Sequence, residues 1–133
     1  MTITKTPDAV AVVEPIVDHL QQAWNSGDGM GFAGPFAEDA DFVEIRGGHH
    51  HGAVAVGRGH EAIFSTIYAG STVRYAVAQA RELDDRAILA HINATLNAPT
   101  GPMAGDTNAL ASIVLVGDGD DRDIAAFHNT VVA

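Results

Sequence analysis

Residues 88–96 read ILAHINATL, in which apolar and polar side chains alternate. Ile, Ala or Leu occupies every even position, whereas His91, Asn93 and Thr95 fall at odd positions. Successive side chains of a strand point to opposite faces, so this period of two predicts a strand with one buried face. Similar patterns predict further strands at 73–77, 109–116 and 124–132. Acidic turns at 84–85 and 117–121 separate two pairs of these strands, and a looser Pro/Gly-rich connection spans 97–106.

The chain before residue 71 follows the spacing of helices. We expect Asp8 to cap a first helix, whose apolar positions are Val10, Val13, Val17, Leu20 and Trp24. We expect a short second helix over 29–36, a strand over 41–46 and a third helix over 57–70. Helices that come first and antiparallel-type strands that come last indicate an α+β fold, with the helices on one face of a curved sheet.

Composition limits the classes of partner. The chain has 133 residues, which suits one domain over 1–133, with residues 1–7 expected to be disordered. A net charge of −10 argues against nucleic acid and anionic membrane surfaces as partners, because both would repel the chain. There are no cysteines, which excludes disulfides and thiolate metal sites, and we expect a cytoplasmic protein with no cofactor.

Four stretches carry a resemblance to a known superfamily: WNSGD at 24–28, FAEDADFV at 36–43, GRGHEAI at 57–63 and IAAFHNT at 124–130. Together they resemble NTF2-like (SnoaL-like) proteins, which have a cystatin-like fold. The last stretch is similar to the SgcJ/EcaC-type (DUF4440-like) subgroup. The resemblance runs from about Val13 to the C-terminus. It implies a cone in which three N-terminal helices and a curved, mostly antiparallel sheet enclose a pocket, and a homodimer joined through sheet faces.

Members of this superfamily include isomerases, cyclases, dehydratases and non-catalytic carriers. Against its ketosteroid isomerases, Glu44 occupies the place of the general base, and Leu20 stands where those enzymes have an oxyanion-stabilising Tyr. Leu20 can donate no hydrogen bond, and such a loss removes about 3 kcal/mol of transition-state stabilisation. The candidates for acid–base chemistry are Glu44 or Asp41 with His128, the last on a strand face with Ile124, Ala126 and Thr130. The alternatives are that Glu44 faces solvent or pairs with Arg46 or Arg74, and that His128 lies in the core or a dimer face.

The segment 47–52, GGHHHG, predicts a hairpin tip. In an extended segment His49 and His51 point one way and His50 the other, so the three cannot converge on one ion. A zinc site would need another ligand, with Glu44, His60 or His128 as candidates. Because no known ligand spacing supports one, we predict no metal.

The candidate pocket wall is Trp24, Phe32, Phe36, Phe42, Ile63, Ile67, Tyr75, His91 and His128. The alternative for each apolar residue is a place in the ordinary hydrophobic core, and the alternative for His91 is a dimer surface. The first functional hypothesis is a small-molecule binding protein that holds an apolar ligand, with polycyclic metabolites as one class. The alternative is an acid–base cyclase, isomerase or hydratase. The third possibility is a structural dimer whose cavity is filled by side chains.

Overall fold

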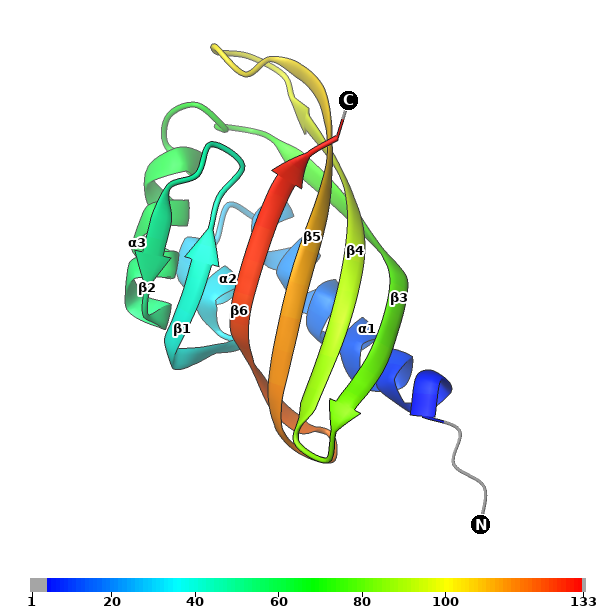
Figure 1. The fold of residues 1–133 in the computed structure, drawn as a ribbon. Coiled ribbons are helices and arrows are strands. Elements are labelled where there is room, and N and C mark those ends of the chain that lie inside the picture. The colour runs from blue at the N-terminus through cyan, green and yellow to red at the C-terminus, as the bar shows by residue number, and fades with distance from the viewer. Residues whose placement is uncertain (1–4, 133) are drawn as a thin grey trace.

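The computed structural model describes residues 5–132, with the side chains of residues 5–8 excepted. The elements are α1 (Lys5–Asn25), α2 (Gly29–Ala33), β1 (Phe36–Val43), β2 (His49–His51), α3 (Ala53–Phe64), β3 (Thr72–Asp84), β4 (Ala87–Ala98), β5 (Gly105–Asp118) and β6 (Asp121–Val131). Helices precede the long strands, so the α+β prediction is confirmed (Figure 1).

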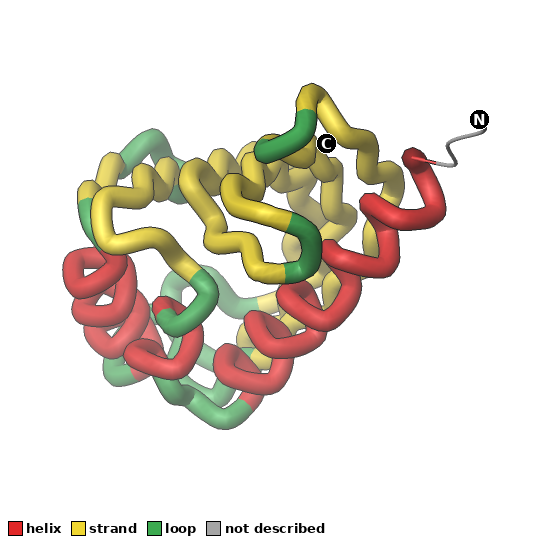
Figure 2. Tube along the Cα trace, turned by 90° about the horizontal axis from the view of Figure 1, so that it is seen from below, coloured by secondary structure: helices red, strands yellow, loops and turns green. Residues whose placement is uncertain are grey.

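The strands form one curved sheet in the order β2-β1-β6-β5-β4-β3. Neighbouring strands are antiparallel except β1 and β6, which run parallel. Figure 2 shows the helices gathered on one side of this sheet. The sheet therefore has a concave face covered by helices and a convex face that is open.

The alternation in residues 88–96 gives β4 its two faces. Ile88, Ala90 and Ile92 are at most 1% exposed, whereas Asn93 is exposed on the opposite face. The same inner face of the sheet contributes Ile113 of β5 and Phe127 of β6 to the core. Burial of each such side chain stabilises the fold by about 1.5–3 kcal/mol, which fixes the register of the strands against the helices.

The ends of the helices differ from the sequence predictions. Helix α1 begins at Lys5, so Asp8 lies inside it, and of the segment expected to be disordered only residues 1–4 lie outside the described part. Pro15 lies inside α1 and has no N–H to donate to the carbonyl of Ala11. Both residues are exposed, so water can bond to that carbonyl and the helix continues. Gly27 ends α1 with a φ of +68°, as its position predicts.

Helix α3 also lies earlier than predicted, and its glycine shows why. Gly57 is not the start of the helix but a contact point in its first half, because a Cβ there would lie 2.5 Å from Met30 Sδ and 3.2 Å from Ala33 Cβ. The missing side chain lets α3 approach α2 closely. Residues 65–70 form turns, and strand β1 begins at Phe36, ahead of the predicted 41–46. Within residues 5–132, no helix has the length and apolarity to span a membrane.

Candidate functional site

A cavity of about 90 Å³ lies between the concave face of the sheet, α3 and the β1–β2 hairpin. Trp24 of α1, Phe42 of β1, Ile63 of α3 and Tyr75 of β3 line it, as predicted. Most of the remaining wall is apolar as well, with Val73, Ala94, Leu96 and Ala109 from the sheet. The lining residues with polar groups are Glu44, Arg46, His50, His60, Tyr68, Tyr75, Thr107 and Asn129.

Trp24 is fixed at the inner wall of this cavity. Its Nε1–H donates to Ser71 Oγ at 3.0 Å, and its ring meets Phe64 edge-on with centroids 4.9 Å apart. The indole is 8% exposed. The hydrogen bond satisfies the indole donor inside the protein, so the ring presents apolar surface to the cavity.

Five predicted wall residues lie elsewhere, one of them His128. Phe32 and Phe36 are 0% and 5% exposed and pack with Phe127 in the core below the cavity. Ile67 lies in the turns after α3, packed against the core. His91 sits on the convex face, where its Nδ1 accepts from Gln79 Nε2 at 2.7 Å. For the two phenylalanines the core alternative is correct.

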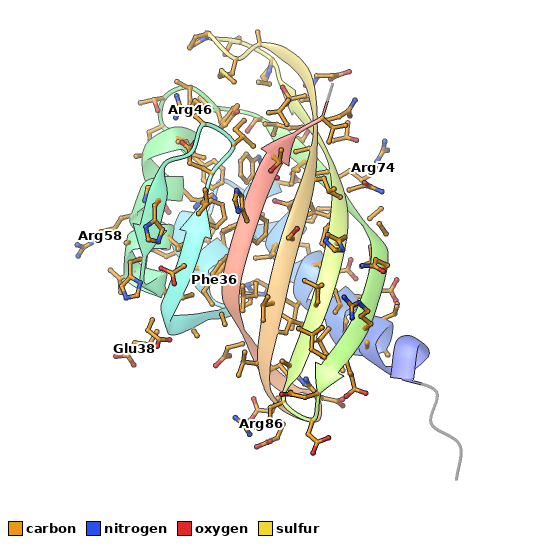
Figure 3. All side chains as sticks on the ribbon, viewed as in Figure 1. Phe36, Glu38, Arg46, Arg58, Arg74 and Arg86 are labelled. Atoms are coloured by element: carbon orange, nitrogen blue, oxygen red, sulfur yellow. The ribbon has the colours of Figure 1, made fainter. Side chains whose placement is uncertain are left out.

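Glu44 lies at the mouth of the cavity, where the hairpin turns. Its side chain is 25% exposed and bonds to the Arg46 guanidinium at 3.2 Å and to the Arg46 backbone N–H. Figure 3 shows Arg46 at the tip of this hairpin. Partial burial alone would raise the pKa of the Glu44 carboxyl, but hydrogen bonds from the Arg46 and Gly48 amides and the Arg46 charge outweigh it and lower the pKa. Glu44 is therefore an ionised carboxylate held by its own loop, a weak proton acceptor.

Asp41 points away from the cavity. Its Oδ1 accepts from His49 Nε2 and His51 Nδ1, each at 2.8 Å, and all three side chains are half or more exposed. These hydrogen bonds lower the pKa of Asp41 and raise that of His51. His49 and His51 share one face of β2, as predicted, while His50 lines the cavity on the other face. Within the described part of the chain, no group of three His, Asp or Glu side chains is arranged to hold a metal ion.

The placement of His128 corrects the sequence analysis. Leu115 pairs with Ile124 and Val114 with Ala126, so Ala125 is an extra residue that shifts the alternation of β6 by one. As a result Ile124 and Phe127 face inward together, and His128 is exposed outside the cavity. His128 does not share a face with Ile124, because the prediction assumed an unbroken period of two.

The same bulge brings Asn129 into the cavity wall, a residue that sequence reasoning missed. Its Oδ1 is buried and has no hydrogen-bond partner among the described residues. A buried acceptor without a partner costs about 1–3 kcal/mol, so this oxygen is a candidate for a ligand contact. No sequence signal marks the bulge, since Ala125 and Ala126 are both small and apolar.

His60 is the second site residue that sequence reasoning missed, having named it only as a metal candidate. It lines the cavity, is 4% exposed and stacks on Phe32 with centroids 4.1 Å apart. Its Nδ1–H donates to the Val56 carbonyl at 2.8 Å, so Nε2 carries a lone pair. Burial lowers the pKa of His60 to about 4, and the ring is neutral near pH 7.

No family model and no curated protein matches this sequence. Solved structures do. A domain of unknown function with a cystatin-like fold from Nostoc punctiforme is 23% identical, with a TM-score of 0.84 over 99% of this chain and 80% of that one. A ketosteroid isomerase-like protein from Erwinia carotovora atroseptica is 11% identical, with a TM-score of 0.76 over 93% and 96% of the two chains. A candidate dehydratase of the NTF2-like family from Streptomyces avermitilis is 14% identical, with a TM-score of 0.73 over 93% and 96%.

At these identities the likeness concerns the backbone alone, and it agrees with the helices and sheet described above. The chain has the cystatin-like, NTF2-like fold.

Proposed function

We propose that this protein binds a compact, largely apolar small molecule in the cavity and releases it unchanged. The observation that carries the proposal is an aromatic-lined cavity whose wall includes two acceptors, His60 Nε2 and Asn129 Oδ1, for which no protein donor is present among the described residues. Binding sites for small molecules are typically apolar with a few placed polar groups. We also place the chain in the SnoaL-like, SgcJ/EcaC-type subgroup, on the strength of residues 124–130.

The size of the cavity limits the ligand. Its volume of about 90 Å³ is below the roughly 300 Å³ at which drug-sized pockets begin. A ligand with one ring suits this space, and a polycyclic metabolite would require the hairpin that carries Glu44 and His50 to move outward. A cavity of this size also suits the structural alternative, in which side chains alone occupy it.

The arrangement of polar groups favours binding over turnover. Glu44 has a lowered pKa and is held by Arg46 and Gly48, so it is a poor general base. Leu20 is 1% exposed inside the core, where it offers no donor to an oxyanion. The candidate pair Asp41 and His128 lies outside the cavity lining.

An acid–base enzyme is the second candidate, because Glu44 and His60 line the same cavity. The ketosteroid isomerase-like and candidate dehydratase neighbours share the fold and so are compatible with such chemistry. In this reading Glu44 and His60 take the roles first assigned to Glu44 or Asp41 with His128.

Ligand screening with chemical analysis separates these functions. The chain has a single Trp, Trp24, whose fluorescence reports on the cavity wall. One-ring and polycyclic compounds are titrated, and each hit is recovered for mass spectrometry. Saturable binding with unchanged compound is the expected result. A compound that is altered, with the change lost in Glu44→Gln, would instead establish an enzyme.

A matched pair of variants shows whether binding occurs in the cavity. Ala94→Leu adds a side chain to the cavity wall, whereas Ala76→Leu adds the same side chain to an exposed position on the neighbouring strand. Ala94→Leu should weaken binding at least about tenfold, because the added atoms occupy the ligand's space. Equal binding by both variants would locate the ligand elsewhere and refute the proposal.

A further inference from the structure

The polar atoms of the cavity are unequally used. Trp24 donates its only N–H to Ser71, and the Arg46 guanidinium bonds to Glu44. The Trp24 donor is therefore committed within the protein, and one Arg46 donor is committed to Glu44 at the mouth of the cavity. Figure 3 shows Arg58 of α3 pointing away from the molecule, so its charge is not directed at the cavity.

Two residues of the cavity wall, His60 and Asn129, hold acceptors without a donor among the described residues. His60 spends its Nδ1–H on Val56, and the remaining ring nitrogen has a lone pair and no proton to give. Asn129 holds an oxygen without a partner among residues 5–132. The Tyr68 and Tyr75 hydroxyls stay protonated, because burial raises the pKa of both, and each can donate or accept.

The charge of the protein argues against an anionic ligand. Glu44 places a carboxylate at the mouth of the cavity, and the chain carries a net charge of −10. Because Arg46 pairs with Glu44, the charges at the mouth largely cancel, and the net charge of the chain is what repels an anionic ligand.

We infer that the ligand is a neutral compound with one ring and a hydroxyl or amino group, which donates a hydrogen bond to His60 Nε2 or Asn129 Oδ1. Phenols and aromatic amines have this chemistry, whereas ketones and ethers have no donor and carboxylic acids are anionic near pH 7. The cavity of about 90 Å³ is smaller than the roughly 150 Å³ cavity that takes benzene, so a one-ring compound would fill it and extend into its open mouth. The inference rests on the proposed function and names the class of ligand for the same cavity.

Phenol and toluene form a matched pair for the test, because a hydroxyl replaces a methyl group of similar size. Toluene is the more apolar of the two and would bind more tightly to a cavity without acceptors. A hydrogen bond to an otherwise unpaired acceptor should make phenol bind about fivefold more tightly than toluene. Aniline should follow phenol, while acetophenone and benzoate should bind more weakly than phenol.

The titration is followed by NMR on the single indole N–H, that of Trp24. Equal or tighter binding of toluene, acetophenone or benzoate would overturn the inference and leave the proposed function standing. No shift with any of these compounds would refute the proposed function itself, in favour of a cavity filled only by side chains. These comparisons use the unaltered protein and do not depend on the folding of a variant.

A pair of variants then assigns the acceptor. Asn129→Leu removes the amide oxygen at nearly constant volume, and Asn93→Leu makes the same change at an exposed position of β4. The preference for phenol over toluene should fall about fivefold in Asn129→Leu and stay unchanged in Asn93→Leu. If it persists in Asn129→Leu, His60→Phe should remove it, and persistence in both would contradict the inference.

Discussion

His60 should make this fold sensitive to mild acid. Its ring is 4% exposed and is surrounded by Trp24, Phe32, Phe42 and Phe64, so a charge on it would lack solvation. Burial, with the like charge of His50 adding to it, lowers the pKa of His60 to about 4 against an ordinary value of 6.5. The unfolded chain therefore takes up a proton below about pH 6.5 that the folded protein does not accept until about pH 4.

The sign and size of the effect follow from these two values. Because the unfolded state binds more protons, the free energy of unfolding falls as the pH is lowered through this window. The difference of about 2.5 between the pKa values corresponds to about 3 kcal/mol when the window is crossed completely. Down to about pH 5 the loss is about 2 kcal/mol, a large part of the stability of an ordinary domain.

Urea unfolding, followed by Trp24 fluorescence near pH 7 and near pH 5, measures this loss. The variant His60→Phe keeps an aromatic ring in place and removes the titrating group. Between the two conditions the wild type should lose about 2 kcal/mol more than His60→Phe. Other groups titrate in the same window, and the comparison cancels them because both proteins share them. His91→Phe, a change on the convex face, serves as the control and should lose as much as the wild type. Equal losses in wild type and His60→Phe would refute the reasoning.

Two further predictions concern the surface. The hydrogen bond to Asp41 raises the pKa of His51, so this interaction stabilises the hairpin at low pH and is lost as the pH rises through that pKa. The variant Asp41→Asn should return the pKa of His51, measured by NMR titration, toward its ordinary value. An unchanged pKa would exclude Asp41 as the cause. The chain should form a homodimer through the convex faces of its sheets, where Leu110 is 37% exposed. Sedimentation should then show a dimer, and Leu110→Arg should dissociate it. Leu83, which is 50% exposed at the end of β3, serves as the control, and Leu83→Arg should leave the dimer intact. A monomeric wild type would contradict this prediction.

The sheet was predictable because burial reinforces a period of two. In β4 every second residue faces the helices, so the pattern of 88–96 survives in the structure without interruption. In β6 the extra residue Ala125 breaks this period, and the prediction failed from that point onward. His128 and Asn129 exchanged faces as a consequence, which replaced a titratable candidate by an amide at the cavity wall.

Aromatic residues were harder to assign from sequence than strands. Trp24 and Phe32 both lie on apolar faces of helices, and only the three-dimensional packing separates cavity wall from core. No sequence pattern indicated that His60 would be buried in the cavity wall. Its burial here depends on the rings of Trp24, Phe32 and Phe42, which reach it only in the folded protein.

The difference between a binding site and an acid–base site in this fold depends on how its polar groups are held. A catalytic carboxylate gains from an apolar surrounding that raises its pKa, whereas Glu44 lies in a turn that supplies amide N–H groups and a guanidinium and lowers it. Turnover would also require a donor near the ligand's oxygen; Leu20 provides none, and the cavity lining offers the hydroxyl-bearing Tyr68 and Tyr75 instead. The cavity wall also retains a neutral His60 and an unpaired Asn129 oxygen, both of which can accept a hydrogen bond from a ligand. These groups support the proposed binding function, which the fold by itself does not decide.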